Sequence, residues 1–297
     1  MVPEFKPIAV SDQKTFQLYL AKCPQVTSDY TFVNLWGWAS AYDLEWAQAG
    51  DFIWLRQNRP KTKYWAPIGD WRAADWPGYF KRFPRFKSEI IRVPEALARL
   101  WESEFGSDIA ISEDRDQFDY LYDAEELITL SGNRFHKKRN LLNQFRKKYD
   151  YQYGEMSSEF VDAALAMQAK WCTWRECNSD AELANENQAI AKVLSQWDEL
   201  DGIMGGCILV NGEMAAYTIG ERMDNTLVVH FEKGSTDYKG IYQTINQMFL
   251  EHTLAGALTG IRYVNREQDL GDAGLRRSKE SYHPVEFLKK FQVDFHQ

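Results

Sequence analysis

The sequence predicts an α/β (α+β) protein of two domains, each a mixed, mostly antiparallel sheet flanked by helices. Three observations support this. The chain has 297 residues, which is longer than a single compact core usually serves. Hydrophobic residues make up 44% and aromatic residues 14%, with 11 Trp, so each half can bury a core of its own. Short β-like runs alternate with helical stretches throughout. We place the domain boundary at residue 150, giving domains 1–150 and 151–297.

The first half mixes helix and strand signals. Ser11 and Asp12 precede an apolar run and can cap a helix, because small polar side chains accept hydrogen bonds from the free amides of a first turn. Pro94, at a first helical position, predicts a helix to about residue 104. Runs of β-branched and aromatic residues predict strands at 52–55, 64–67 and 88–93. The longest predicted helix runs from Ser131 to Tyr149.

The second half contains the clearest hairpin signal. Asn211 and Gly212 separate two β-like runs, 204–210 and 213–221, and both residues tolerate the positive φ of a type I′ turn. A third strand at 226–232 completes a meander. The other predicted elements are a strand at 151–155, helices at 158–174, 180–197 and 240–256, a strand at 261–264, a short helix, and a closing strand at 285–295.

Charge is unevenly distributed along the chain. The net charge of -8 disfavours non-specific binding to nucleic acid or an anionic membrane. From Arg134 to Lys148, however, there are seven Lys or Arg and no Asp or Glu. Clustered cations gain affinity for the phosphates of tRNA by releasing counterions. The alternative is a solvated face on a helix that bridges two domains. The candidate phosphate or nucleic-acid patch is Arg134, Lys137, Lys138 and Arg139.

The chain shows no signal for a membrane span or a metal site. No run approaches the roughly 18 apolar residues that cross a bilayer, and the N-terminal residues resemble no signal peptide, so we expect a cytoplasmic protein. The four cysteines have unrelated spacings, with no CxxC and no nearby pair of histidines. We therefore expect no metal and interpret Cys23, Cys172, Cys177 and Cys207 as buried free thiols.

The order of elements in the second half resembles the GNAT acyltransferases, in which two central strands splay apart and the cofactor enters the gap. That family places a Gln/Arg-x-x-Gly-x-Gly/Ala loop between a strand and a helix, where backbone amides and the helix dipole suit a phosphate. Here residues 237–242 occupy the loop and only Gly240 matches, since Asp237 and Tyr242 replace a basic and a small residue. The resemblance implies Lys239, Gly240 and Tyr242 as cofactor-binding residues. Alternatively, Gly240 only lets the chain turn into a helix.

A wider resemblance covers nearly the whole chain. It is carried by Ser131 to Phe145, by Glu232-Lys233 with Tyr238-x-Gly240-x-Tyr242, and by Val264 to Gly271 with Gly274-Leu275-Arg276, Lys279 and Ser281 to Pro284. These stretches resemble the uncharacterised DUF2156 family, related to the C-terminal domain of lysyl-phosphatidylglycerol synthase. The resemblance implies two tandem GNAT-like domains and transfer of an aminoacyl group from tRNA, as in the similarly built Fem-type peptidoglycan transferases. The synthase's large transmembrane region is absent from this sequence, so a lipid acceptor does not carry over.

The segment from Asn265 to Tyr282 is dense in groups that acyl transfer requires. The reaction needs a base for the attacking group, donors for the developing oxyanion and an acid for the leaving oxygen. The candidate assignments are Glu267 or Asp269 as base, Arg276 or Lys279 for phosphate or the oxyanion, Tyr282 as acid, and Asn265 among the cofactor-binding residues. The alternative is an ordinary salt-bridged surface turn.

Two polar residues lie on the third strand of the meander. His230 shows no Asp or Cys partner in the sequence, so we interpret it as a hydrogen-bonded structural residue. Glu232 projects from the same face and is closer to the end of the strand at which GNAT-like proteins open their cleft. Glu232 is therefore a catalytic candidate.

Three functions remain open. The first is a soluble acyltransferase that moves an aminoacyl group from aminoacyl-tRNA or a similar donor to a small or peptidic amine or hydroxyl acceptor. The second is an acyl-CoA-dependent N-acyltransferase with a degenerate phosphate loop. The third is a non-catalytic GNAT-like module that binds a ligand in the cleft. No resident cofactor is assigned, because aminoacyl-tRNA or acyl-CoA would enter as the donor substrate.

Overall fold

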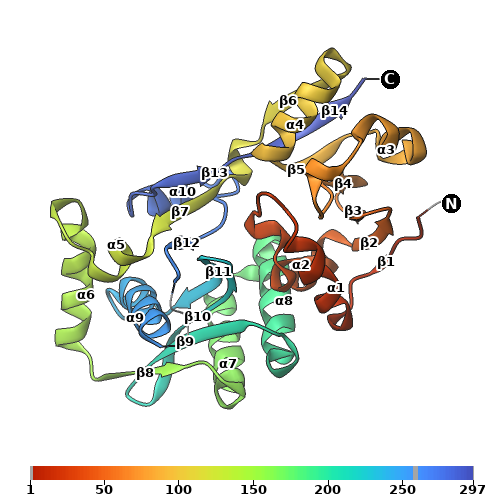
Figure 1. The fold of residues 1–297 in the computed structure, drawn as a ribbon. Coiled ribbons are helices and arrows are strands. Elements are labelled where there is room, and N and C mark those ends of the chain that lie inside the picture. Colours follow the sequence, from red (N-terminus) through yellow and green to blue (C-terminus); the bar gives the residue numbers. More distant parts are fainter. Residues whose placement is uncertain (1–2, 257–259, 297) are drawn as a thin grey trace. The chain divides into compact units, whose positions relative to one another are not determined.

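The chain forms two compact units in the computed structural model, which describes residues 3–256 and 260–296; within these residues each unit is built on a mixed seven-stranded sheet (Figure 1). The first unit comprises Met1–Asp119, Gln268–Ala273 and Phe287–Gln297, and the second comprises Tyr120–Glu267 and Gly274–Glu286. The predicted α+β fold with two mixed sheets is confirmed. The division falls after Asp119 rather than at residue 150, and the C-terminal residues return to the first unit.

The first sheet has the strand order β1-β2-β3-β4-β5-β14-β6. Its strands are β1 (Lys6–Pro7), β2 (Leu44–Ala49), β3 (Phe52–Gln57), β4 (Lys63–Trp65), β5 (Ile90–Pro94), β6 (Ile109–Glu113) and β14 (Lys290–Phe295). The accompanying helices are α1 (Gln13–Leu20), α2 (Phe32–Tyr42), α3 (Trp76–Arg82) and α4 (Glu95–Phe105). The β4–β5 pair is parallel and the other pairs are antiparallel.

Aromatic side chains fill the core of the first unit. Trp54 of β3 stacks on Phe86, with ring centroids 4.0 Å apart. Trp76 and Trp101, from α3 and α4, meet edge to face at 5.1 Å. Phe295 of β14 packs against the ring of Phe80 at 4.8 Å, so the end of the chain contributes to this core.

The second sheet has the strand order β13-β7-β12-β11-β10-β9-β8. Its strands are β7 (Asp119–Asp123), β8 (Tyr151–Glu155), β9 (Ile203–Val210), β10 (Glu213–Met223), β11 (Thr226–Gly234), β12 (Tyr263–Asn265) and β13 (Glu286–Leu288). The accompanying helices are α5 (Ala124–Thr129), α6 (His136–Lys148), α7 (Ser158–Trp174), α8 (Ala181–Ser195), α9 (Ile241–Ala255) and α10 (Ala273–Glu280). The β11–β12 pair is parallel, whereas β7–β12 and the meander β8 to β11 are antiparallel.

The meander of the second sheet is covered on both faces. The predicted turn is present, since Asn211 and Gly212 have φ of 52° and 82°. Ala216 of β10 packs with Ile241 and Ile245 of α9. The next residue, Tyr217, points to the opposite face, where its hydroxyl donates a 2.5 Å hydrogen bond to Gln168 of α7.

The strands β11 and β12 separate after a short pairing. They pair only over Thr226–Val228 and Tyr263–Asn265, while β11 continues to Gly234. The pairing with β10 also skips one residue: Ile219 pairs with Phe231 and Gly220 pairs with Val229. The residue left out is His230, which therefore occupies a β-bulge beside the split. This is the splayed arrangement expected of the second half.

Two cysteines differ from the prediction. Cys172, in the last turn of α7, and Cys177 form a disulfide, with Cα atoms 5.1 Å apart. The chain reverses at Glu176, whose φ of 53° brings the following residue back toward the helix end. The prediction of four free thiols is therefore wrong for this pair, and it holds for Cys23 and Cys207.

Among the helices in residues 3–256 and 260–296, none combines the length and apolar character required to cross a bilayer.

Candidate active site

His230 of β11 contacts two carboxylates, which come from the segments on either side of it. Its Nδ1 lies 2.7 Å from Oε1 of Glu267, which follows β12. Its Nε2 lies 3.0 Å from Oε1 of Glu221 on β10. The imidazole is fully buried, and the backbone amide of Glu267 donates to the Asn265 side chain at 2.8 Å. Asn265 thus holds the turn that presents Glu267 to His230.

His230 is protonated at neutral pH. Burial alone would lower its pKa, but hydrogen bonds and charge from Glu221 and Glu267 outweigh burial and raise the pKa to about 9. With both ring nitrogens donating, His230 has no lone pair for a general base. The interpretation of His230 as structural fits this geometry. Its two partners lie 9 and 37 residues away, beyond the reach of sequence pattern.

Glu232 and Arg266 form a second bridge across the split. Glu232 lies near the end of β11, and Arg266 immediately follows β12. An Arg266 Nη2 donates to Glu232 Oε1 at 3.1 Å, and Asn246 Nδ2 of α9 donates to the other carboxylate oxygen at 3.2 Å. Both charged side chains are largely buried. The split is therefore lined by paired charges rather than by backbone hydrogen bonds.

Tyr282 and Lys138 join the same cluster. Tyr282 is buried, and the Arg266 guanidinium lies 5.0 Å from the centre of its ring. Burial raises the pKa of Tyr282 although Arg266 opposes this, so the phenol keeps its proton at neutral pH. Lys138 of α6 places Nζ 4.0 Å from the centre of the Tyr282 ring. Burial, together with the charge of Arg266, lowers the pKa of Lys138 to about 8.

Lys279 supports the cluster from α10. Its buried ammonium donates to the backbone carbonyl of Arg266, and its own carbonyl accepts a 2.9 Å hydrogen bond from the Tyr122 hydroxyl. Lys279 thus fixes the backbone at Arg266. Arg276, three residues earlier on the same helix, is half-buried.

Several predicted residues do not join this cluster. Asp269 belongs to the first unit, where its fully buried carboxylate pairs with Arg115 at 3.0 Å and accepts from the Gly271 amide at 2.9 Å. Lys239 is exposed at the turn before α9. The half-buried Tyr242 follows on α9, and burial raises the pKa of its hydroxyl.

Gly240 is required by packing at the start of α9. It has φ of 94°, a conformation that side-chain-bearing residues rarely adopt. A Cβ there would lie 2.3 Å from the carbonyl oxygen of Leu141 on α6. The alternative interpretation, that Gly240 lets the chain turn into a helix, fits these contacts.

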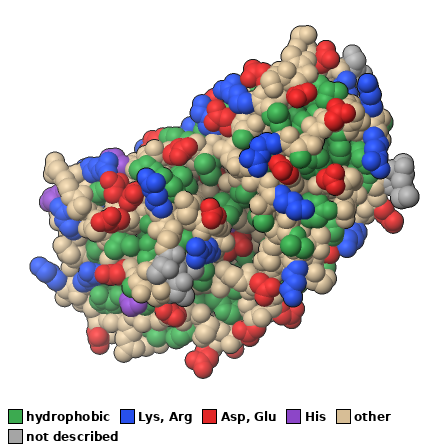
Figure 2. Space-filling view, viewed as in Figure 1, with side chains coloured by type: hydrophobic (Ala, Val, Ile, Leu, Met, Phe, Trp, Pro, Cys, Tyr) green, Lys and Arg blue, Asp and Glu red, His purple; other side chains and the backbone are tan. Residues whose placement is uncertain are grey.

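The basic helix distributes its cations among several roles. Arg134 pairs with Glu126, and Arg139 donates to the backbone carbonyls of Leu130 and Gly132. Lys138 points to the Tyr282 cluster, whereas Lys137 is exposed. On the face in Figure 2, Lys and Arg side chains over α6 alternate with Asp and Glu side chains. The helix starts after a 3₁₀ turn, Asn133–Phe135, rather than at Ser131.

Comparisons with known proteins place the chain in a family. The family model described as phosphatidylglycerol lysyltransferase, C-terminal, matches residues 20–293. The chain belongs to this family. The resemblance found in the sequence is confirmed.

Among solved structures, a conserved protein of unknown function from Bacteroides thetaiotaomicron is 30% identical, with a TM-score of 0.89 over 99% of this chain and 100% of that chain. L-PGS from Bacillus licheniformis is 13% identical and has a TM-score of 0.62 over 96% of this chain and 92% of that chain, a likeness of fold alone. The uncharacterized protein MYCGA3080 of Mycoplasmoides gallisepticum is 24% identical over 176 residues, which is 59% of this chain and 55% of that relative. The chain therefore covers about half of that relative's length.

Arg266 and Glu221 are not among the candidate site residues predicted from the sequence. Arg266 directly precedes the candidate Glu267, and Glu221 is a buried carboxylate on β10. Both residues can be read from the sequence, but their positions do not show that Arg266 pairs with Glu232 or that Glu221 contacts His230. Together the clustered groups offer an ammonium, a guanidinium, a phenol and a carboxylate, which are the groups that acyl transfer uses.

Proposed function

We propose that the second unit transfers an aminoacyl group from aminoacyl-tRNA, or a similar ester donor, to an amine or hydroxyl acceptor. The observation that carries the proposal is the meeting of Lys138 and Arg266 at the ring of Tyr282, with Arg266 also paired to Glu232, at the split between β11 and β12. Membership of the phosphatidylglycerol lysyltransferase C-terminal family supports it.

In the proposed reaction, the nitrogen or oxygen of the acceptor attacks the ester carbonyl carbon of the donor. A bond forms between them, the ester C–O bond breaks, and one proton passes from the acceptor to the leaving oxygen overall. Arg266 and Lys138 provide positive charge for the oxyanion. Glu232 accepts the proton of the attacking group, and Tyr282 protonates the leaving oxygen. Glu267 is assigned to orienting His230 rather than to the base role, because it contacts the imidazolium, whereas Glu232 contacts Arg266 beside the Tyr282 ring.

The exposed cations of α6 are proposed to contact the phosphates of the donor. Lys137 and Lys148 are exposed and 11 residues apart, which places them on the same face about 16 Å apart. Arg134 and Arg139 are engaged within the protein and contribute less. Each phosphate contact adds to the salt dependence of binding.

The test is a transfer assay with purified protein, charged tRNAs carrying radiolabelled amino acids, and a panel of amine and hydroxyl acceptors. Lys138→Ala and Tyr282→Phe are expected to lower kcat by about a hundredfold or more, because they remove charge and a proton donor at the reacting atoms. Lys137→Ala is the matched control, since it is the neighbouring lysine but is exposed. It should keep kcat and raise KM, most strongly at high salt.

Normal turnover by both Lys138→Ala and Tyr282→Phe would contradict the assignment of this cluster. Transfer from acyl-CoA but from no charged tRNA would instead favour an N-acyltransferase. The packing of Gly240 against α6 weighs against that alternative, because it accounts for the one residue of the phosphate loop that matches.

A further inference from the structure

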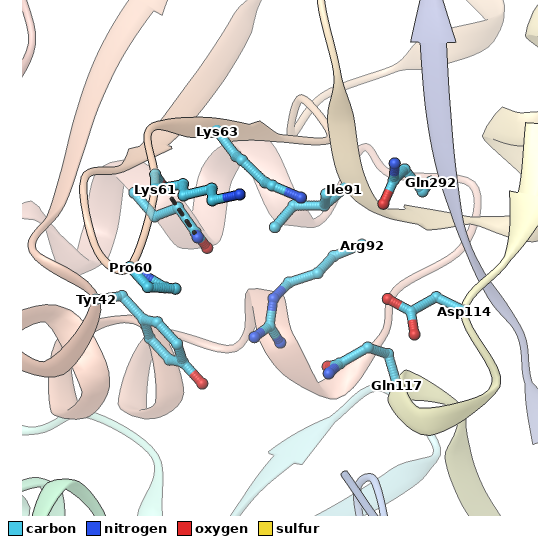
Figure 3. Close-up of a pocket in the computed structure, with 10 residues that line it drawn as sticks. Tyr42, Pro60, Lys61, Lys63, Ile91, Arg92, Asp114, Gln117 and Gln292 are labelled. Carbon is cyan, nitrogen blue, oxygen red and sulfur yellow. Dashed lines mark hydrogen bonds between the residues drawn. The ribbon is translucent and has the colours of Figure 1, made fainter. Parts of the chain in front are cut away.

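The first unit holds a cavity of about 300 Å³ that the transfer reaction does not use. Its polar walls come from the end of β3 (Gln57), the β3–β4 loop (Lys61), the start of β4 (Lys63), β5 (Arg92) and the turn after β6 (Asp114, Gln117) (Figure 3). All these residues belong to the first unit. The volume lies at the lower limit of ordinary small-molecule sites, so a molecule of amino-acid size fits better than a nucleotide.

A β-bulge places Arg92 in this cavity. Strands β5 and β14 pair Ile90 with Val293 and Val93 with Phe291, so two residues of β5 lie opposite Gln292 alone. Arg92 has φ of 55°, in the left-handed region that arginine rarely adopts. Bulges redirect side chains, and residues held in such backbone conformations cluster at functional sites. In Figure 3 the Arg92 side chain extends into the middle of the cavity.

Arg92 is buried but not fully satisfied. Only 9% of its surface is exposed, its Nη1 donates to the Asp29 carboxylate, and its guanidinium lies 4.2 Å from the ring centre of Trp65. Within residues 3–256 and 260–296, its Nε finds no hydrogen-bond acceptor, and the buried Gln117 Oε1 finds no donor. Buried polar atoms normally have partners. A ligand that accepts a hydrogen bond from Arg92 Nε and donates one to Gln117 Oε1 would satisfy both atoms.

The charges that line the cavity are separated. Lys61 and Lys63 extend from one side of Arg92, whereas Asp114 and Gln117 lie on the other (Figure 3). Lys63 also pairs with Glu89, and burial raises the pKa of Asp114. A wall of cations facing a carboxylate and an amide oxygen suits a molecule that carries both charges.

We infer that this cavity binds a free amino acid or a zwitterion of similar size, with its carboxylate at Arg92 and Lys61 and its ammonium at Asp114 and Gln117. The inference goes beyond the proposed transfer reaction, since it assigns a second site in the other unit. It requires neither tRNA nor an acceptor.

Calorimetric titration of the full chain with individual amino acids tests the site. Each amino acid is compared with the amine that lacks the carboxylate and with the acid that lacks the amine. Saturable binding is expected for at least one amino acid and should weaken by about tenfold or more in Lys61→Ala and in Asp114→Asn. Asp114→Asn should also bring the affinity of the amino acid close to that of its amine-free analogue. Lys14→Ala, an exposed lysine of the same unit away from the cavity, should bind normally.

Three results would overturn the inference: no saturable binding of any amino acid up to about 10 mM, equal binding by wild type and both cavity variants, or equal affinity for the amine-free analogue. Circular dichroism melts of Lys61→Ala and Asp114→Asn establish that each variant is folded. Because the titration contains no donor and no acceptor, its failure would leave the transfer proposal intact, and a failed transfer assay would leave this site intact.

Discussion

The charge on His230 should make stability depend on pH. Its pKa rises from 6.5 to about 9 in the folded protein, so the folded state binds this proton more tightly than the unfolded state. The His230 proton therefore makes its full contribution to the free energy of unfolding below pH 6.5. This contribution, up to about 3 kcal/mol, is lost as pH rises through about 9. Denaturant unfolding across this range measures the loss, and ¹⁵N NMR of the imidazole reports the proton directly.

Two variants separate this effect from the titration of other groups. His230→Gln should remove this part of the pH dependence and lower stability at pH 6.5. His296→Gln, which changes an exposed histidine near the C-terminus, should leave the profile unchanged. An imidazole that titrates near 6.5 in the folded protein would contradict the double carboxylate contact.

The residue types of the candidate site were predictable, but their pairing was not. Glu232 and Tyr282 were named from the sequence as catalytic candidates and Lys138 for the phosphate patch, whereas the structure places Lys138 at the Tyr282 ring. The Glu232–Arg266 pair joins positions 34 residues apart, and it forms because β11 extends beyond the end of β12. Local sequence patterns do not predict where the pairing of two strands ends. Asp269 was grouped with Glu267 because they are close in sequence, yet they belong to different units.

At the level of elements, the packing of α9 against α6 depends on Gly240. Gly240→Ala should destabilise the second unit by about 3 kcal/mol, because the new Cβ would meet the Leu141 carbonyl at 2.3 Å in addition to the unfavourable φ of 94°. Gly260→Ala is the matched control, with the same φ of 94° and no atom within 4 Å. Urea unfolding of both variants isolates the contact. Equal losses of stability in the two variants would show that the positive φ, and not the contact with Leu141, accounts for the effect.

Sequence pattern located elements better than it located their partners. The strand at 151–155 and the helix at 158–174 have the predicted bounds, because hydrophobic periodicity and capping are local. The predicted closing strand at 285–295 is two strands, β13 and β14, that belong to different sheets. Local propensity identifies a strand but does not say which sheet it joins, since that depends on tertiary contacts.

At the level of the whole molecule, the chain crosses between its units more than once. The first unit takes residues up to Asp119, the segment Gln268–Ala273 and the last residues from Phe287. A boundary at residue 150 follows from the end of the basic helix, which is a local feature. The observed division follows from β14, which lies between β5 and β6 although nearly two hundred residues separate it from them.

Removal of the C-terminal strand should therefore unfold the first unit selectively. A chain that ends at Leu288 lacks β14, its ring contact between Phe295 and Phe80, and the fully buried Lys290 that pairs with Asp29 and Asp119. Loss of Lys290 leaves two buried carboxylates short of a cation, so the loss of stability should exceed about 3 kcal/mol. Hydrogen exchange should show lost protection in β5 and β6 and retained protection in β9 to β11. A chain that ends at Phe295 is the control, and protection of β5 and β6 in the shorter chain would show that β14 is dispensable.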